Sequence, residues 1–276
     1  MSLFVQTNVA SLVAQDNFAT TELELNKTME QLSSGYKINS AADDAAGLGI
    51  ASRLSAQVAS FTSATQNANT AISMTQTADG GAAQISNILT RLRQLAVEGA
   101  NGTMSPSDSA NLDTEFQAQL SEINQIANTT IYNGQNVLAG AAAASNFQVG
   151  INTTASDTMS VTFGGADVAG LGLTGAAVNT SASSTAAINS IDTAIQSLST
   201  TRAGFGAAMD GLQDVVSNLQ SMSTDTSSAL SQVRDIDVAQ ATAMLAQQQV
   251  LAQAGESVLS QANQLPQLAE SLIRGQ

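Results

Sequence analysis

The chain has 276 residues, of which 43% are hydrophobic and only 3% aromatic, and it carries a formal net charge of −14. A core of this composition must consist mainly of aliphatic side chains, which favours packing of helix on helix. The acidic balance argues against nucleic acid and anionic membrane as partners, because both require Lys and Arg to displace counterions.

Cysteine and histidine are both absent from the chain. Their absence excludes disulfides, Cys nucleophiles, Ser-His triads and every zinc motif that contains His. Catalysis by carboxylates alone stays formally open, but we predict a non-enzymatic protein with no cofactor and no metal. No Lys or Arg precedes Lys27, and no apolar run approaches membrane-spanning length. These rules alone predict a soluble, cytoplasmic protein without a secretory signal.

The apolar residues between Val5 and Leu32 recur at helical spacing, with polar residues between them. We predict an amphipathic helix here, ending at Gly35, where glycine adopts the left-handed conformation at little cost. Asp43 and Asp44 then precede a second helical pattern. Adjacent residues on a helix do not face each other, so helix capping is favoured over a metal site.

The second helix is predicted to extend to Glu98. Gly80 and Gly81 interrupt its apolar rhythm, and each glycine in a helix costs about 1 kcal/mol relative to alanine. We therefore expect a bend, a stutter or a break at this point. A third helix begins with Ser105 as N-cap and Pro106 at the first helical position.

The segment from Tyr132 to Gly134 is predicted to form a turn, and the composition then shifts to small and polar residues over about 139–185. Alternating residues at 147–151 and 159–163 predict two short strands, arranged as a hairpin. This segment is the place for exposed, variable surface. Its glycine pairs match no phosphate-binding loop, since the lysine and the strand-to-helix context are missing.

A second set of helices follows the middle segment. Apolar residues between Ile188 and Leu219 step by three and four, with Arg202 as the one polar member. The helical signal weakens over 221–228 and resumes from Leu230 to the end of the chain. The fold class is therefore mainly α, a long antiparallel helical bundle or coiled coil of paired N- and C-terminal segments with a small β-hairpin region between them.

The predicted domains follow from this palindromic order. Residues 1–40 pair with 236–276 in a terminal coiled coil, residues 41–138 with 186–235 in a long-helix bundle, and residues 139–185 form a short variable segment. The seam between the terminal helices is predicted from their apolar spacing. It comprises Val5, Val9, Leu12, Leu25, Met29, Leu32, Met244, Leu251, Val258, Ala262, Leu265 and Leu272. Gln248, Gly255 and Pro266 are weak points in this seam.

Several ordered motifs resemble bacterial flagellin. In the first half these are residues 6–12 (QTNVASL), 32–35 (LSSG) and 38–48 (INSAADDAAGL). In the second half they are residues 234–237 (RDID), 253–255 (QAG) and 261–267 (QANQLPQ). The resemblance covers about the first 138 and the last 90 residues. It lacks the large outer domain that many flagellins insert.

The resemblance implies a structural subunit of a helical, homo-oligomeric flagellar filament that supports motility. It implies export in an unfolded state without a cleaved signal, with an export chaperone, a filament cap and junction proteins as partners, and an extracellular location that replaces the cytoplasmic default. The imperfect terminal seam would then be completed by neighbouring subunits. The alternative is a hook-filament junction protein. A flagellin carrying a metallopeptidase insert is excluded by the lack of histidine.

One motif resembles the flagellin segment recognised by the vertebrate Toll-like flagellin receptor. It is residues 89–95 (LTRLRQL), with Glu115 at the acidic position of the following helix. The resemblance assigns Arg91, Leu95 and Glu115 to receptor contact, with a guanidinium beside an apolar side chain on one helical face. Gln94 stands where the family often has Glu. The structural alternative is that Arg91 pairs with a carboxylate on a neighbouring helix or subunit.

Overall fold

The structure is a computed structural model that describes residues 7–274, with side chains described for residues 7–264. Within this range the elements are mostly helical, which confirms the predicted fold class. The helices are α1 (Val9–Ser34), α2 (Ala45–Gly99), α3 (Pro106–Thr129), α4 (Ser181–Arg234) and α5 (Val238–Arg274). By its internal contacts the chain forms two units, the first from Met1–Ala56 with Thr226–Gln276 and the second from Gln57–Asp225.

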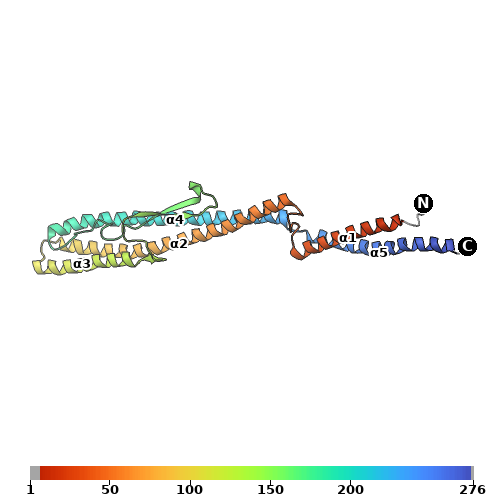
Figure 1. The fold of residues 1–276 in the computed structure, drawn as a ribbon. Coiled ribbons are helices and arrows are strands. Elements are labelled where there is room, and N and C mark those ends of the chain that lie inside the picture. The colour runs from red at the N-terminus through yellow and green to blue at the C-terminus, as the bar shows by residue number, and fades with distance from the viewer. Residues whose placement is uncertain (1–6, 275–276) are drawn as a thin grey trace. The chain divides into compact units, whose positions relative to one another are not determined.

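In the first unit α1 and α5 lie side by side and antiparallel (Figure 1). Asn8 is the N-cap of α1, and Gly35 ends the helix in the left-handed region with φ of 76°. The predicted start of this helix at Val5 lies outside the described residues. Asp237 caps α5, because its Oδ1 accepts hydrogen bonds from the amides of Ala239 and Gln240.

The predicted weakening of the helix over 221–228 is wrong. The helix α4 continues through this Ser/Thr-rich segment to Arg234. The hydroxyls of Ser221 and Thr224 donate to backbone carbonyls four residues earlier, at 3.1 and 2.9 Å, so they are satisfied within the helix. The chain leaves the helical conformation instead at 235–237, immediately before α5.

The second unit packs its parts of α2 and α4 with α3 around an aliphatic core (Figure 1). Phe116 of α3 is fully buried in it, and the rings of Phe163 and Phe205 lie 5.7 Å apart. The polar member of the α4 row, Arg202, pairs with Asp79 of α2 at 2.7 Å. This ion pair explains how an arginine fits in an otherwise apolar row.

Two short antiparallel hairpins complete the second unit. The strands β1 (Ile131–Tyr132) and β2 (Gln135–Asn136) flank the predicted turn, where Asn133 and Gly134 have φ of 47° and 78°. The strands β3 (Ala143–Gln148) and β4 (Thr158–Phe163) form the second hairpin. A short 3₁₀ helix, η1 (Ala155–Asp157), precedes β4.

The second predicted strand pair is present as a hairpin, but its first strand lies earlier in the chain than the predicted residues 147–151. The strand β3 begins four residues earlier than expected and ends at Gln148. The amides of Val149 and Gly150 both donate to the carbonyl of Asp157, at 2.8 and 2.9 Å, and this shared acceptor ends the regular ladder.

Of the bend, stutter or break predicted at the glycine pair of α2, the break is wrong, because α2 is helical without interruption from Ala45 to Gly99. A Cβ atom at Gly81 would lie 2.6 Å from Leu138 Cδ1 and 2.7 Å from Thr130 Oγ1. At Gly80 the same atom would meet nothing within 4 Å. Gly81 therefore allows the segment after α3 to approach the helix closely, and packing outweighs its low helix propensity.

The two glycines give a matched pair of variants. We expect Gly81→Ala to lower the free energy of unfolding by about 1–3 kcal/mol, because neither neighbour can move away without repacking. Gly80→Ala should raise it by up to about 1 kcal/mol through helix propensity alone. Urea unfolding followed by circular dichroism measures both values. Equal effects of the two variants would contradict the assignment of Gly81 to close packing.

Candidate functional site

The contact between α1 and α5 consists largely of small and polar residues. The least exposed residues of each helix follow a regular rhythm of three and four, as in a coiled coil. On α1 they are Ser11, Ala14, Phe18, Thr21, Leu25, Thr28 and Leu32; on α5 they are Ala241, Leu245, Gln248, Ala252, Gly255, Leu259 and Ala262. We call these residues the inner rows.

Of the nine predicted seam residues whose side chains are described, six are not in the inner rows. Val9, Leu12, Met29, Met244, Leu251 and Val258 are between 45% and 56% exposed. Leu25 and Leu32 are half-buried, and Ala262 is buried, all in the inner rows. Val5 lies outside the described residues, and the side chains of Leu265 and Leu272 are not described.

The prediction that the larger apolar residues hold the two helices together is therefore wrong for the six exposed ones. The physical reason is that small residues let the helices approach closely. A Cβ at Gly255 would lie 3.2 Å from the Phe18 ring, so the phenylalanine occupies the space left by the missing side chain. Gln248 and Gly255, which were taken as weak points of the seam, both lie in the inner row of α5.

Gln248 is a polar group within the inner row of α5. Its Oε1 is the one buried side-chain oxygen or nitrogen that lacks a hydrogen-bond partner in the described part of the chain. A buried acceptor without a donor costs about 1–3 kcal/mol. The pairing of α1 with α5 therefore includes an unfavourable contribution at its centre.

The two connections that adjoin this helix pair are hydrogen-bonded to each other. The amide of Lys37 donates to the carbonyl of Arg234 at 2.7 Å, and the amide of Ile236 donates to the carbonyl of Gly35 at 3.1 Å. The Arg234 guanidinium lies 3.7 Å from the centre of the Tyr36 ring, a cation–π contact. Asp44 accepts from the amide of Gly47, which confirms its predicted role as a helix cap.

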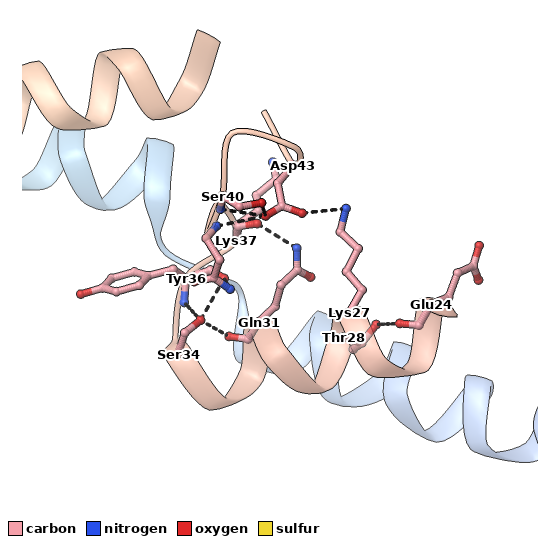
Figure 2. A network of polar contacts seen from close by, with 10 residues as sticks. Glu24, Lys27, Thr28, Gln31, Ser34, Tyr36, Lys37, Ser40 and Asp43 are labelled. Carbon is pink, nitrogen blue, oxygen red and sulfur yellow. Dashed lines mark hydrogen bonds and ion pairs between the residues drawn. The ribbon is translucent and has the colours of Figure 1, made fainter. Parts of the chain in front are cut away.

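Asp43 has a different role from the predicted helix cap. Figure 2 shows its carboxylate between Lys27, whose Nζ lies 3.0 Å away, and Ser40, which donates from its amide and its hydroxyl. The amide of Asn39 also donates to it, at 3.3 Å. The hydrogen bond from Lys27 and those from the Ser40 backbone lower the pKa of Asp43 from 3.8 to about 2. Asp43 thus ties the connection to α1.

The residues assigned to receptor contact are only partly brought together. Arg91 and Glu115 are both half-exposed and form an ion pair at 2.6 Å, which is the structural alternative expected for Arg91. Leu95 is 1% exposed and belongs to the core of the second unit. The expectation of an apolar side chain beside the guanidinium on the surface is therefore wrong, because α3 and α4 require that face of α2 for the core.

Among residues 7–274 there is no group of three or more His, Cys, Asp or Glu that could hold a metal ion. Nor does any helix in the same range have the length and apolarity to cross a membrane. The inner rows, the exposed apolar residues beside them and the hydrogen-bonded connections are the features that distinguish the first unit.

Comparison with known proteins shows the family of the chain. The bacterial flagellin N-terminal helical region matches residues 5–143, and the bacterial flagellin C-terminal helical region matches residues 188–273. The chain belongs to the bacterial flagellin family. Flagellins are the structural subunits of the flagellar filament, which lies outside the cell, so this flagellin is a filament subunit.

Two relatives match almost from end to end. The flagellin of Halalkalibacterium halodurans is 33% identical over 272 residues, covering 99% of this chain and 100% of the relative. The flagellin of Listeria monocytogenes is 34% identical over 285 residues, covering 98% and 99%. Both relatives are therefore similar to this chain in length.

A solved structure from Vibrio parahaemolyticus, described as flagellar hook-associated, shares the fold. It covers 70% of this chain and 100% of its own, with a TM-score of 0.58 and 15% identity. The fold alone thus does not separate filament and junction proteins. The flagellin sequence matches separate these two classes of protein, and they do not favour the hook-associated alternative.

The lowered pKa of Asp43 predicts an acid-sensitive connection in this flagellin. A carboxyl group with a lowered folded pKa stabilises the folded state fully above its unfolded pKa, near 3.8, and loses that contribution as the pH falls through about 2. The free energy of unfolding should therefore fall between about pH 4 and pH 2 more steeply in the native chain than in Asp43→Asn.

Other groups titrate in the same range, so the comparison with Asp43→Asn is essential. The Thr154 hydroxyl lowers the pKa of Asp157, and Arg93 lowers the pKa of Asp192. Asp157 and Asp192 are present in both proteins, so their contributions cancel when the pH dependence of the variant is subtracted from that of the native chain. Carbon-detected NMR of the Asp43 carboxyl measures its pKa directly, and a midpoint at 3.8 would contradict the ion pair with Lys27.

Proposed function

We propose that the exposed apolar residues of α1 and α5 are the surfaces through which neighbouring copies of this flagellin assemble into the filament. Of the fourteen large hydrophobic residues that are exposed in the described chain, ten lie on these two helices. On α1 they are Val9, Leu12, Val13, Leu23 and Met29; on α5 they are Val238, Met244, Val250, Leu251 and Val258. We call these ten residues the outer rows.

The division between inner and outer rows is the observation that carries this proposal. A coiled coil that is stable by itself places its large apolar residues between the helices. Here small and polar residues fill most of that position, and ten large apolar side chains of the two helices are exposed. Exposed apolar side chains that gather on two neighbouring helices favour a protein interaction site. Identical copies in a head-to-tail arrangement that does not close produce a helical filament, so each copy can cover the outer rows of the next.

Export in an unfolded state is the second part of the proposal. No cysteine is present to form a disulfide that would hold the chain folded, and the terminal pair contains an unpartnered Gln248. A terminal pair of low stability unfolds readily, which suits passage through a narrow secretion channel. An export chaperone, a filament cap and junction proteins are the partners that belong to this route.

The arrangement proposed for the filament follows the domain division expected from the sequence. Residues 1–40 with 236–276 form its inner core, residues 41–138 with 186–235 the next layer, and residues 139–185 the variable outer segment. Recognition by the vertebrate Toll-like flagellin receptor is proposed for the exposed pair of Arg91 and Glu115 only. Leu95 would contribute by positioning α2 within the core.

Substitutions in the outer rows test the assembly surface. Leu251→Ser and Val258→Ser should each raise the critical concentration for elongation from filament seeds about tenfold or more, because each removes apolar surface that assembly buries. Gln247→Ser, at an exposed polar position of the same helix, is the control and should change it little. Sedimentation of seeded reactions gives the critical concentration. Normal elongation by both outer-row variants would exclude α5 as an assembly surface.

Gln248 tests the instability of the unassembled pair. Gln248→Leu should raise the free energy of opening of α1 and α5 by about 1–3 kcal/mol, because it replaces an unpartnered buried acceptor by an apolar group. Amide hydrogen exchange of the unassembled chain should show slower exchange in both helices. The control is Gln247→Leu, at an exposed neighbour. The same exchange rates in both variants would show that the buried acceptor is not what weakens the pair.

A further inference from the structure

Pro266 leaves one backbone carbonyl of α5 without its usual partner. In an α-helix the carbonyl of Ala262 accepts from the amide of residue 266, but proline has no amide hydrogen. The helix nevertheless continues past this point to Arg274. Ala262 is only 6% exposed, so water has little access to satisfy the carbonyl. A buried carbonyl needs a donor from elsewhere in the chain.

Asn8 supplies that donor from the opposite end of the sequence. Its Nδ2 donates to the carbonyl of Ala262 at 2.8 Å. Its Oδ1 accepts from the amide of Ser11 at 3.1 Å, which makes Asn8 the N-cap of α1. One amide side chain therefore starts α1 and joins it to α5 at the same time.

A neighbouring contact strengthens the same junction. The hydroxyl of Ser11, a buried residue of the inner row, donates to Oδ1 of Asn263 at 2.7 Å. The first turn of α1 is thus held to two successive residues of α5 by side-chain hydrogen bonds. The first buried apolar residue of α1 is Ala14, which offers little surface to hold this end by packing.

We propose that Asn8 is a positioning residue for filament assembly, and that Pro266 is required because it frees the acceptor that Asn8 uses. The Asn8–Ala262 hydrogen bond makes the start of α1 depend on its docking to α5. It thereby fixes where the outer-row residues Val9, Leu12 and Val13 are presented to the next copy. This inference rests on the proposed role of the outer rows in assembly.

The chemistry of the asparagine amide separates its two roles. Asn8→Asp and Asn8→Ser both keep an oxygen that caps α1, since Asp, Ser and Asn are similarly good N-caps. Both lose the Nδ2 donor to Ala262. Pro266→Ala supplies an amide hydrogen to the same carbonyl within α5, so in that background the donor from Asn8 is no longer needed to satisfy it.

The experiment measures the critical concentration for seeded elongation of the full chain, together with amide hydrogen exchange of α1 in the filament. We expect both Asn8 variants to raise the critical concentration about fivefold to tenfold and to speed exchange in the first turns of α1. In the Pro266→Ala background the same Asn8 substitutions should change the critical concentration no more than about twofold. Agreement between the charged and the neutral variant excludes charge as the cause.

Equal effects of the Asn8 substitutions with and without Pro266 would overturn the proposal, since Asn8 would then act elsewhere, as on a neighbouring copy. Unchanged assembly and exchange in the Asn8 variants would overturn it as well. Failure of the proposed function has a separate signature, because the Leu251 and Val258 variants would then elongate normally. Those variants carry the intact Asn8–Ala262 contact, so the two failures are distinguishable.

Discussion

The close approach of α1 and α5 through small residues is the constraint on which the rest of the first unit depends. Gly255 leaves space for the ring of Phe18, and small or polar residues make up most of the inner rows. Ten large apolar residues are therefore exposed on the outside of the pair. If these side chains were buried within the single chain, assembly would bury no further apolar surface there. Because they are exposed, contact with neighbouring copies can remove them from water.

Polar contacts compensate at the two ends of the pair for what the inner rows lack in apolar area. At one end Asn8 and Ser11 bond to Ala262 and Asn263. At the other end the connections around Gly35 and Arg234 bond to each other, and Lys27 holds Asp43. Hydrogen bonds give direction and position for a modest net free energy. Such a pair can be specific in geometry and still open easily, which suits both the proposed export and the proposed assembly.

Most of the helices, the caps at Asp44 and Ser105, and the family could be predicted from the sequence because they depend on local pattern. Spacing by three and four identifies amphipathic helices wherever they pack, and Ser105 and Pro106 specify a helix start by themselves. The sequence did not show which face of α1 contacts which face of α5. Spacing by three and four supports a row of contact residues and the row beside it equally well. The close contacts of Gly81 and Gly255 are tertiary, and a glycine in a sequence equally suggests a break. The burial of Leu95 likewise depends on α3 and α4, which no local motif includes.

The central claim is that assembly covers the outer rows of α1 and α5. A cryo-electron reconstruction of the filament tests it most directly, by measuring the exposed fraction of Leu12, Leu251 and Val258 in a subunit surrounded by its neighbours. We predict that side chains about half exposed in the single chain become buried against other copies. Outer rows that still face solvent in the filament, with subunits joined through the second unit alone, would contradict the account.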